Sequence, residues 1–233
     1  MRIAISQRQD NGHGGMDALE VSYVDYFSQR GATLIPMPNT AAYVNRYFDE
    51  LAIDAVVLSG GGDIRPALYG GNPVVDGNFS SKRDATEQAM LAIALERDLP
   101  VLGICRGMEF INTYFGGKIC RSTDIAGGLN HDETRHDVTI APKAITEALG
   151  GDSFEVNSYH RMVIGAGQLS SQLRSFAVAS DGTIEGFYHP QHAIGAVVWH
   201  PEREVQPHIL NEFLIKAFFS RELFWQKRKA STV

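Results

Sequence analysis

The sequence has few cysteines, no long hydrophobic run and no excess of basic residues. Its two cysteines, Cys105 and Cys120, are too few for a disulfide framework. No apolar stretch approaches the length of a membrane span, and the first residues lack the apolar core of a signal peptide. Lysine and arginine number 21 against 27 acidic residues, a net charge of −6. We therefore expect a cytoplasmic protein that binds neither nucleic acid nor a membrane. The negative net charge still permits a small phosphorylated ligand.

The hydrophobic pattern predicts one α/β domain over residues 1–233, a length that suffices for one large core. Strand and helix patterns alternate in the first half, which is typical of a parallel sheet with helices on both faces. The predicted strands there are 3–6, 33–37 and 55–58, followed by the strand that begins at residue 101. The predicted helices are 16–29, 41–52, 84–97 and 108–115.

From residue 138 the pattern changes to short strands, which predict an antiparallel extension of the main sheet. These strands are 138–141, 154–157, 176–179, 184–188 and 193–199. A helical pattern covers about residues 205–224, and we expect the basic residues 226–233 to form a flexible tail. The predicted fold therefore has three layers around a mostly parallel central sheet, as in flavodoxin-like proteins.

A cysteine stands in a sharp turn between a strand and a helix. Gly103-Ile104-Cys105-Arg106-Gly107 follows an apolar strand and precedes a helical pattern, which is the arrangement of a nucleophile elbow with sulfur in place of oxygen. The helix N-terminus that follows offers free N–H groups and the positive end of the helix dipole, and both favour a thiolate. Cys105 is therefore a candidate nucleophile, whereas Cys120 is expected to serve packing.

A histidine and a glutamate follow a second apolar strand about a hundred residues later. His200-Pro201-Glu202 ends this strand, and residues two apart in extended chain share a side. Glu202 can then orient His200, which would act as base and acid for Cys105. The alternative, a buried free cysteine and an unrelated histidine at a strand end, does not explain the two motifs together.

A glycine-rich turn, residues 59–63, follows the strand at 55–58. We expect backbone N–H groups of Gly61 or Gly62, with that of Arg106, to form an oxyanion hole. A phosphate-binding loop is the rival interpretation, but no Gly-Lys-Ser/Thr follows the glycines. In a parallel sheet this turn, Cys105 and His200 all fall at the carboxyl ends of strands, where ligands bind.

The connection at residues 121–136 contains two histidines and two acidic residues within 131–136, which raises the question of a metal. His131 and His136 do not have the spacing of a helical ligand pair, and the segment has no cysteine partner. A thiolate hydrolase also needs no metal. We therefore expect neither a metal nor a cofactor, and expect some of the side chains of residues 131–136 to bind a polar substrate.

These segments resemble the class I glutamine amidotransferase-like hydrolases, and within them the γ-glutamyl-γ-aminobutyrate hydrolase group of cysteine peptidases (peptidase C26). The resemblance covers nearly the whole chain. It rests on residues 58–63, 65–66, 68–70, 83–87, 99–108, 156–160 and 199–202. Asp63 and Arg106 favour the hydrolase branch over plain glutaminase domains. The chain departs from the group at Glu109, where glutamine is usual, and at Arg203, where an aromatic residue is common; both positions lie near the expected pocket and bear on the substrate rather than on the reaction.

The resemblance implies cleavage of a γ-glutamyl amide to glutamate and a free amine through a γ-glutamyl thioester on Cys105. The amine is a γ-aminobutyrate-like compound or a larger nucleotide-linked or phosphate-linked one. By the same resemblance we expect substrate-binding residues near the cysteine, namely Asn157, Ser158, His160, Glu109 and Arg65. For Asn157 and Ser158 the alternative is a turn in which both side chains satisfy their own backbone.

Two other functions stay open at this point. The chain could be the glutaminase subunit of an amidotransferase that delivers ammonia to a partner synthase, which predicts low activity without the partner. A binding or regulatory relative is the third interpretation, which the complete set of Cys105, His200 and Glu202 disfavours. A homodimer is compatible with a chain of this size, although no pattern indicates an interface.

Overall fold

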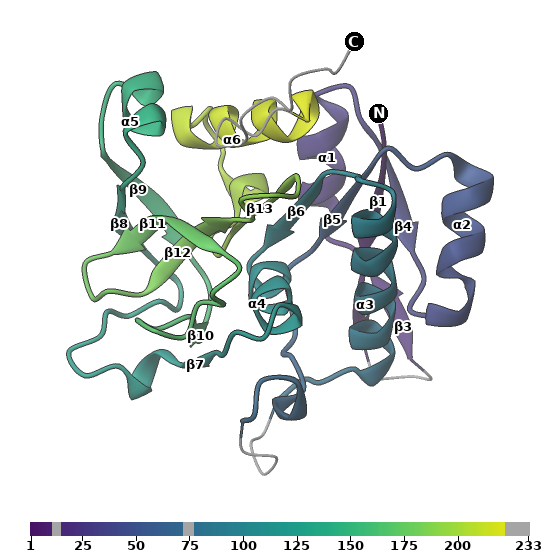
Figure 1. Cartoon of the computed structure of the whole chain (residues 1–233), viewed down its shortest axis with the longest axis horizontal. Helices are drawn as coiled ribbons and strands as arrows, with labels where there is room; N and C mark the ends of the chain where they lie inside the picture. The colour runs from purple at the N-terminus through teal and green to yellow at the C-terminus, as the bar shows by residue number, and fades with distance from the viewer. Residues whose placement is uncertain (11–14, 72–76, 222–233) are drawn as a thin grey trace.

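A nine-stranded sheet forms the centre of the protein in the computed structural model, which describes residues 1–10, 15–71 and 77–221 (Figure 1). The strand order is β4-β1-β5-β6-β13-β12-β11-β8-β9. The first five strands in this order are parallel, and the remaining four extend the sheet in antiparallel fashion. The predicted α/β fold with an antiparallel extension is confirmed.

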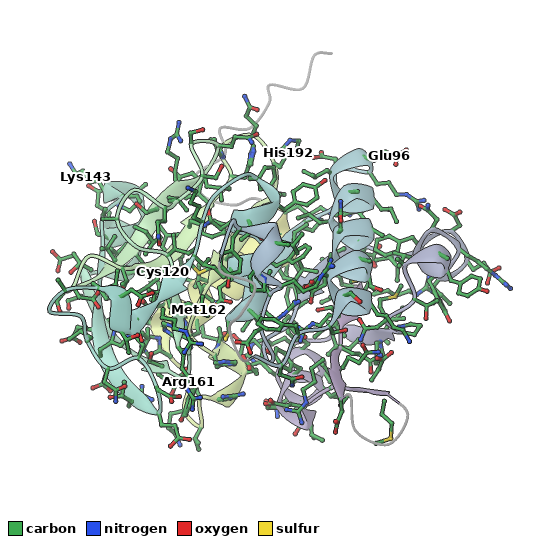
Figure 2. All side chains as sticks on the ribbon, turned by 90° about the horizontal axis from the view of Figure 1, so that it is seen from below. Glu96, Cys120, Lys143, Arg161, Met162 and His192 are labelled. Atoms are coloured by element: carbon green, nitrogen blue, oxygen red, sulfur yellow. The ribbon has the colours of Figure 1, made fainter. Side chains whose placement is uncertain are left out.

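The strands of the main sheet are β1 (Arg2–Ser6), β4 (Thr33–Met37), β5 (Ala55–Leu58), β6 (Val101–Ile104), β8 (Thr134–Ile140), β9 (Ser153–Ser158), β11 (Arg174–Ala179), β12 (Ile184–Tyr188) and β13 (Ile194–Val197). Two small sheets pair β2 (Arg8–Asp10) with β3 (Met16–Ala18), and β7 (Cys120–Arg121) with β10 (Met162–Val163). Figure 2 shows Cys120 and Met162 of the second small sheet close together.

Helices cover both faces of the parallel half of the sheet. They are α1 (Val21–Ser28), α2 (Val44–Leu51), α3 (Ser81–Glu96), α4 (Arg106–Tyr114) and α6 (Ile209–Ser220), whereas α5 (Lys143–Leu149) packs against β8 and β9 of the extension. Short 3-10 turns lie at Ala41–Tyr43, Pro66–Leu68, Ser122–Asp124 and Pro201–Arg203. Ile3 and Ile5 of β1 pack in the core beneath α1 and α6, whereas Ala4 packs in the core of α2, α3 and α4. Alternate side chains of one strand thus serve opposite layers.

Two predicted helices begin later than the sequence pattern indicates. Residues 16–18 form strand β3 because they pair with β2, and the carboxylate of Asp17 also accepts hydrogen bonds from the backbone N–H and the side-chain amide of Asn39, both at 2.7 Å. The last helix begins at Ile209, directly after Pro207 and His208. A proline disfavours helical conformation in the residue before it, which explains the late start. The predicted tail at 226–233 lies outside the described residues.

The carboxyl ends of the parallel strands bring three distant segments together, as expected for this topology. The turn after β5, the turn after β6 and the segment after β13 all lie at this edge of the sheet, because these strands are neighbours. Among the described residues, no helix has the length and apolarity needed to cross a membrane.

Candidate active site

Cys105 occupies a strained turn between β6 and α4. Its backbone has φ 53° and ψ −112°, a conformation that residues other than glycine rarely adopt and that is typical of functional sites. Gly107 permits this turn to pack, since a Cβ there would lie 2.0 Å from the carbonyl oxygen of Leu58. The turn is fixed to the sheet by a 2.8 Å hydrogen bond from the Cys105 N–H to the carbonyl of Val197. The local geometry is that of a nucleophile elbow.

His200 reaches Cys105 from the neighbouring strand. A Cβ added at Gly60 would lie 2.8 Å from His200 Cε1 and 3.3 Å from Cys105 Cβ, so the two side chains meet above this glycine. Nδ1 of His200 lies 2.5 Å from Oε1 of Glu202, and both side chains are buried. The structure therefore brings the three residues of the predicted triad together in one chain of contacts.

The charges of this trio favour an ion pair between cysteine and histidine. Burial alone would raise the pKa of the Cys105 thiol, but the charge of His200 and a hydrogen bond from its ring lower the pKa to about 7. Burial would lower the pKa of His200, but the Cys105 thiolate and Glu202 raise it to about 10. At neutral pH much of Cys105 is thus a thiolate beside an imidazolium.

The predicted oxyanion donors lie around the cysteine. Gly61 and Gly62 have φ of 82° and 71° and line the same pocket as Cys105, and the backbone N–H of Arg106 faces the thiol. The N–H of Gly60 is taken, because it donates to the hydroxyl of Tyr23 at 2.9 Å. For Gly61 and Gly62, no described group accepts a hydrogen bond from the N–H. Their donation to an oxyanion stays a prediction.

A buried arginine–carboxylate network, formed by Arg83, Asp84, Glu87 and Arg106, supports the elbow and the glycine turn. Arg83 donates to Glu87 at 2.8 Å, and Arg106 donates to Asp84 at 2.6 Å and also to Glu87. The other guanidinium nitrogens of Arg83 donate to the carbonyl of Ser59 at 2.6 Å and to that of Gly61. Sequence reasoning assigned no structural role to this network. The sequence does contain one sign of the network, because Arg83 and Glu87 are four residues apart on one helix and opposite charges at that spacing can form an ion pair.

A pocket of 330 Å³ opens in front of Cys105. It has mixed charge, since the acidic residues Asp63, Glu109 and Asp132 and the basic residues Arg161 and Arg203 share its wall. The remaining lining residues are Gly61, Gly62, Asn78, Cys105, Arg106, Tyr159, His160, Met162 and His200. In Figure 2, Arg161 projects on the side of the molecule that faces the viewer.

Two of the predicted substrate-binding residues, Glu109 and His160, line this pocket. Burial and the nearby Cys105 raise the pKa of Glu109 to about 8, so its carboxyl is mostly protonated at neutral pH and can donate a hydrogen bond. Burial would lower the pKa of His160, but Glu185 and Cys105 raise it to about 9.

The other three predicted substrate-binding residues, Asn157, Ser158 and Arg65, do not line this pocket among the described residues. The side chain of Asn157 accepts from the N–H of His200 at 2.8 Å and donates to the His200 carbonyl at 2.9 Å, so it positions the backbone of the histidine. Ser158 donates to the carbonyl of His131 at 2.7 Å. Arg65 pairs with Asp84 at 2.6 Å. Each is held by distant segments rather than by its own turn.

The structure also gathers a histidine cluster, formed by His131, His136, His160 and Glu185. One ligand atom from each lies within 4.8 Å of the others. Neither His131 nor His136 lines the pocket in front of Cys105, although Asp132 between them does. That some side chains of this loop contact the substrate stays a prediction for Asp132, whereas His131 and His136 face Glu185 of β12. These four side chains are the group in the described part of the chain that could hold a metal.

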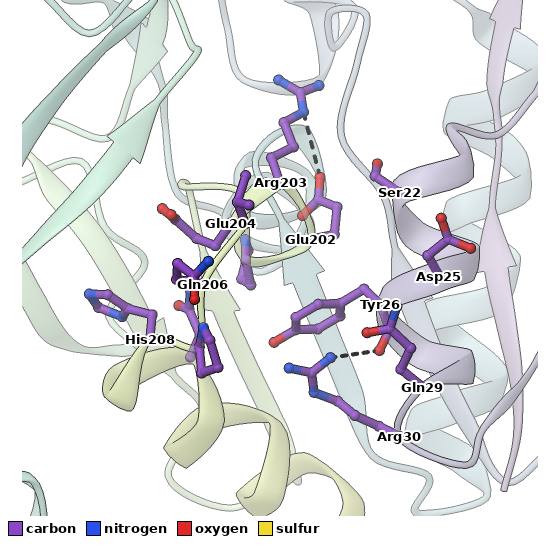
Figure 3. A pocket seen from close by; sticks show the side chains of 14 residues that line it. Ser22, Asp25, Tyr26, Gln29, Arg30, Glu202, Arg203, Glu204, Gln206 and His208 are labelled. Carbon is purple, nitrogen blue, oxygen red and sulfur yellow. Dashed lines mark hydrogen bonds and ion pairs between the residues drawn. The ribbon is translucent and has the colours of Figure 1, made fainter.

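A second cavity, of 520 Å³, lies behind Glu202 between α1 and residues 201–208 (Figure 3). Figure 3 shows Glu202 paired with Arg203 on its wall and Arg30 bonded to the carbonyl of Tyr26. Cys105 does not line this cavity, so it is not the reaction site.

Comparison with solved structures assigns the fold to the class I glutamine amidotransferases. The glutaminase domain of Trypanosoma brucei CTPS with bound acivicin superposes with a TM-score of 0.66, at 14% identity, over 97% of this chain and 95% of that one. The chain belongs to the Peptidase C26 family, whose model matches residues 3–202.

Two curated relatives have similar length. The γ-glutamyl-CDP-amidate hydrolase of Campylobacter jejuni is 31% identical, over 88% of this chain and 91% of the relative. The γ-glutamyl-γ-aminobutyrate hydrolase PuuD of Escherichia coli K12 is 28% identical, over 94% of this chain and 91% of the relative.

Proposed function

We propose that this protein is a cysteine-dependent hydrolase that cleaves the amide bond of a γ-glutamyl amine to glutamate and the free amine. The observation that carries the proposal is the strained Cys105 in contact with His200, whose ring is in turn bonded to Glu202. This arrangement activates a thiol for attack on a carbonyl carbon. The names of the two hydrolase relatives support the γ-glutamyl group as the acyl part of the substrate.

In the proposed reaction the Cys105 thiolate attacks the γ-carbonyl carbon. The N–H groups of Arg106 and of Gly61 or Gly62 stabilise the oxyanion, each donor lowering the barrier by about 3 kcal/mol. The protonated His200 gives its proton to the leaving amine as the carbon–nitrogen bond breaks, which leaves a γ-glutamyl thioester. A water molecule activated by His200 then attacks the thioester, releases glutamate and regenerates the thiolate.

The charge pattern of the pocket supports a zwitterionic acyl group. Acidic Asp63 and Asp132 can face an α-ammonium group, whereas Arg161 and Arg203 can face an α-carboxylate or an anionic leaving group. Protonated Glu109 adds a donor close to the cysteine. This pattern suits both γ-glutamyl-γ-aminobutyrate and a phosphate-bearing γ-glutamyl amide.

Glutamate release from a substrate panel tests the proposal. The panel contains glutamine, γ-glutamyl-γ-aminobutyrate, other γ-glutamyl amines and a nucleotide-linked γ-glutamyl amide. We expect kcat/KM for one γ-glutamyl amine to exceed that for glutamine at least tenfold with the protein alone. Release from glutamine only, or none until a synthase is added, would instead identify the glutaminase subunit of an amidotransferase.

A further inference from the structure

The histidine cluster lies behind the pocket, where four side chains converge. The side chains of His131, His136, His160 and Glu185 are exposed by only 0%, 8%, 2% and 1%. They come from the segment before β8, from β8, from the turn after β9 and from β12. The ring centroid of His131 lies 4.9 Å from those of His136 and His160, so the three rings enclose one small volume with the carboxylate.

In each of these side chains, the atom that faces away from the cluster has a partner. Nε2 of His131 lies 2.9 Å from Asp181 Oδ2, and Nδ1 of His160 lies 2.9 Å from the Met162 carbonyl. The corresponding distance from Nδ1 of His136 to the Asp137 carbonyl is 3.3 Å. A ring nitrogen next to a carbonyl or carboxylate carries a proton, so the opposite nitrogen is the one that can offer a lone pair to a metal, which displaces any second proton from the ring.

The atoms that face into the cluster have no such partner. His131 Nδ1, His136 Nε2, His160 Nε2 and Glu185 Oε2 are buried and make no hydrogen bond with any described group. The nearest approaches, from the three rings to Glu185, are 3.7, 3.7 and 3.8 Å, which is too long for a hydrogen bond. Buried polar atoms are nearly always satisfied, and four that converge without partners indicate a missing occupant.

We propose that the histidine cluster binds a divalent transition-metal ion of the zinc class through three imidazole nitrogens and one carboxylate oxygen. This is a donor set that zinc accepts in tetrahedral geometry. With metal–ligand distances of about 2.0–2.1 Å, ligand atoms lie roughly 3.3 Å apart, so the side chains need to move inward by less than about 1 Å. The bonds from His131 to Asp181 and from His160 to Met162 are the outer contacts that metal-bound histidines typically make.

The metal has a structural consequence for the proposed active site. It joins two strands and two connections of the antiparallel extension, and it fixes His160, which lines the pocket in front of Cys105. The ion lies behind this side chain and takes no part in the attack of the thiolate. The inference therefore does not depend on the proposed reaction.

Metal analysis of the purified full-length chain tests the site. After incubation with Zn²⁺ and dialysis, we expect one zinc ion per chain, and after exchange with Co²⁺ the intense visible absorption of tetrahedral cobalt. His136→Gln and Glu185→Gln should lose both signals, whereas His208→Gln, a histidine outside the cluster, should keep them. Cys105→Ser should also keep them, which separates this site from zinc bound to the catalytic thiolate.

The outcomes are decisive even where a cluster variant folds poorly. Zn²⁺ should raise the Tm of the wild-type chain and of Cys105→Ser, a readout that needs no cluster variant. Retention of less than a tenth of an equivalent of zinc by the wild-type chain, with no change in Tm, would overturn the proposal and leave a proton as the occupant. Loss of the metal signal in Cys105→Ser would overturn it as well.

Discussion

Two buried polar clusters border the active-site pocket, and the chain pairs every carboxylate oxygen of one of them but leaves the inward-facing atoms of the other unpaired. In the arginine–carboxylate network, all four carboxylate oxygens of Asp84 and Glu87 accept a hydrogen bond from a guanidinium. In the histidine cluster, the four atoms that face inward have no hydrogen-bond partner among the described residues. Arg106 of the network and His160 of the cluster both line the pocket.

The two clusters illustrate two ways to fix the side chains around a catalytic pocket, one by ion pairs within the protein and one by a bound ion. Opposite charges that are buried together satisfy each other, so the network fixes the elbow and the glycine turn with protein atoms alone. The inward-facing atoms of the three histidines lie 3.7–3.8 Å from Glu185, too far for a hydrogen bond. The second cluster therefore needs an occupant, and the variants below distinguish the two.

The largest effect is expected from breaking the network. Glu87→Ala leaves Arg83 and Arg106 buried without a shared counter-charge, and we expect a loss of about 3–5 kcal/mol in the free energy of unfolding. Chemical denaturation measures it. Glu96→Ala, at the exposed end of the same helix (Figure 2), should stay within about 0.5 kcal/mol of the wild type. Equal losses in both variants would show that the network contributes no more to the free energy of unfolding than an exposed residue of the same helix.

A smaller effect is expected from filling the histidine cluster. At a free Zn²⁺ concentration about 100 times Kd, binding to the folded state alone adds about 2.7 kcal/mol to the free energy of unfolding. Glu185→Gln removes one ligand and should lose most of this gain, whereas Glu87→Ala, if it folds, should keep it. Denaturation with Zn²⁺ and with a chelator measures both. If Zn²⁺ stabilised Glu185→Gln as much as the wild type, the histidine cluster would not be the site that binds the ion.

The pH dependence of alkylation at Cys105 probes the pocket that both clusters border. The thiolate is the reactive form, so alkylation is slow below the pKa and rises to a plateau above it. We expect the midpoint near pH 7 in the wild type. In His200→Gln it should move toward the ~8.5 of a free cysteine, because the positive charge that favours the thiolate is gone. Mass spectrometry distinguishes Cys105 from Cys120, and an unchanged midpoint would exclude His200 as the partner.

The smallest effect is expected at Glu109, which belongs to neither cluster. Its carboxyl is mostly protonated at neutral pH, so Glu109→Gln keeps a donor and should change kcat/KM at pH 7 by less than about threefold, under about 1 kcal/mol in barrier. Above pH 8 the wild-type carboxyl ionises beside the thiolate, and the variant should then be the more active of the two. Steady-state rates at pH 7 and 9 check this. A large loss at pH 7 would mean that an ionised carboxylate is required.

Local patterns in the sequence predicted much of the fold and the centre of the site. The strand at 55–58 was placed with its observed bounds, and the glycines around Cys105 indicated the elbow, because close packing against Leu58 excludes a side chain at Gly107. The start of α1 was missed, since the hydrogen bonds from Asn39 that hold Asp17 in a strand join residues 22 positions apart.

The sequence did not predict the histidine cluster either, because its members are far apart in the chain. Its members are spread over residues 131–185, and antiparallel pairing of β8, β11 and β12 brings them together. Spacing rules for helical ligand pairs do not detect such a group. Glu185 gave no signal, because a single glutamate in a short strand reads as a surface residue, whereas its side chain is only 1% exposed.

The most direct measurement is glutamate release from the preferred γ-glutamyl amine by Cys105→Ala, compared with Cys120→Ala. Cys120→Ala removes the other thiol, which lies in β7 and does not line the pocket. The account predicts that Cys105→Ala loses turnover by at least about a thousandfold, that Cys120→Ala retains it, and that both chains stay folded by circular dichroism. Undiminished turnover by folded Cys105→Ala would contradict the account.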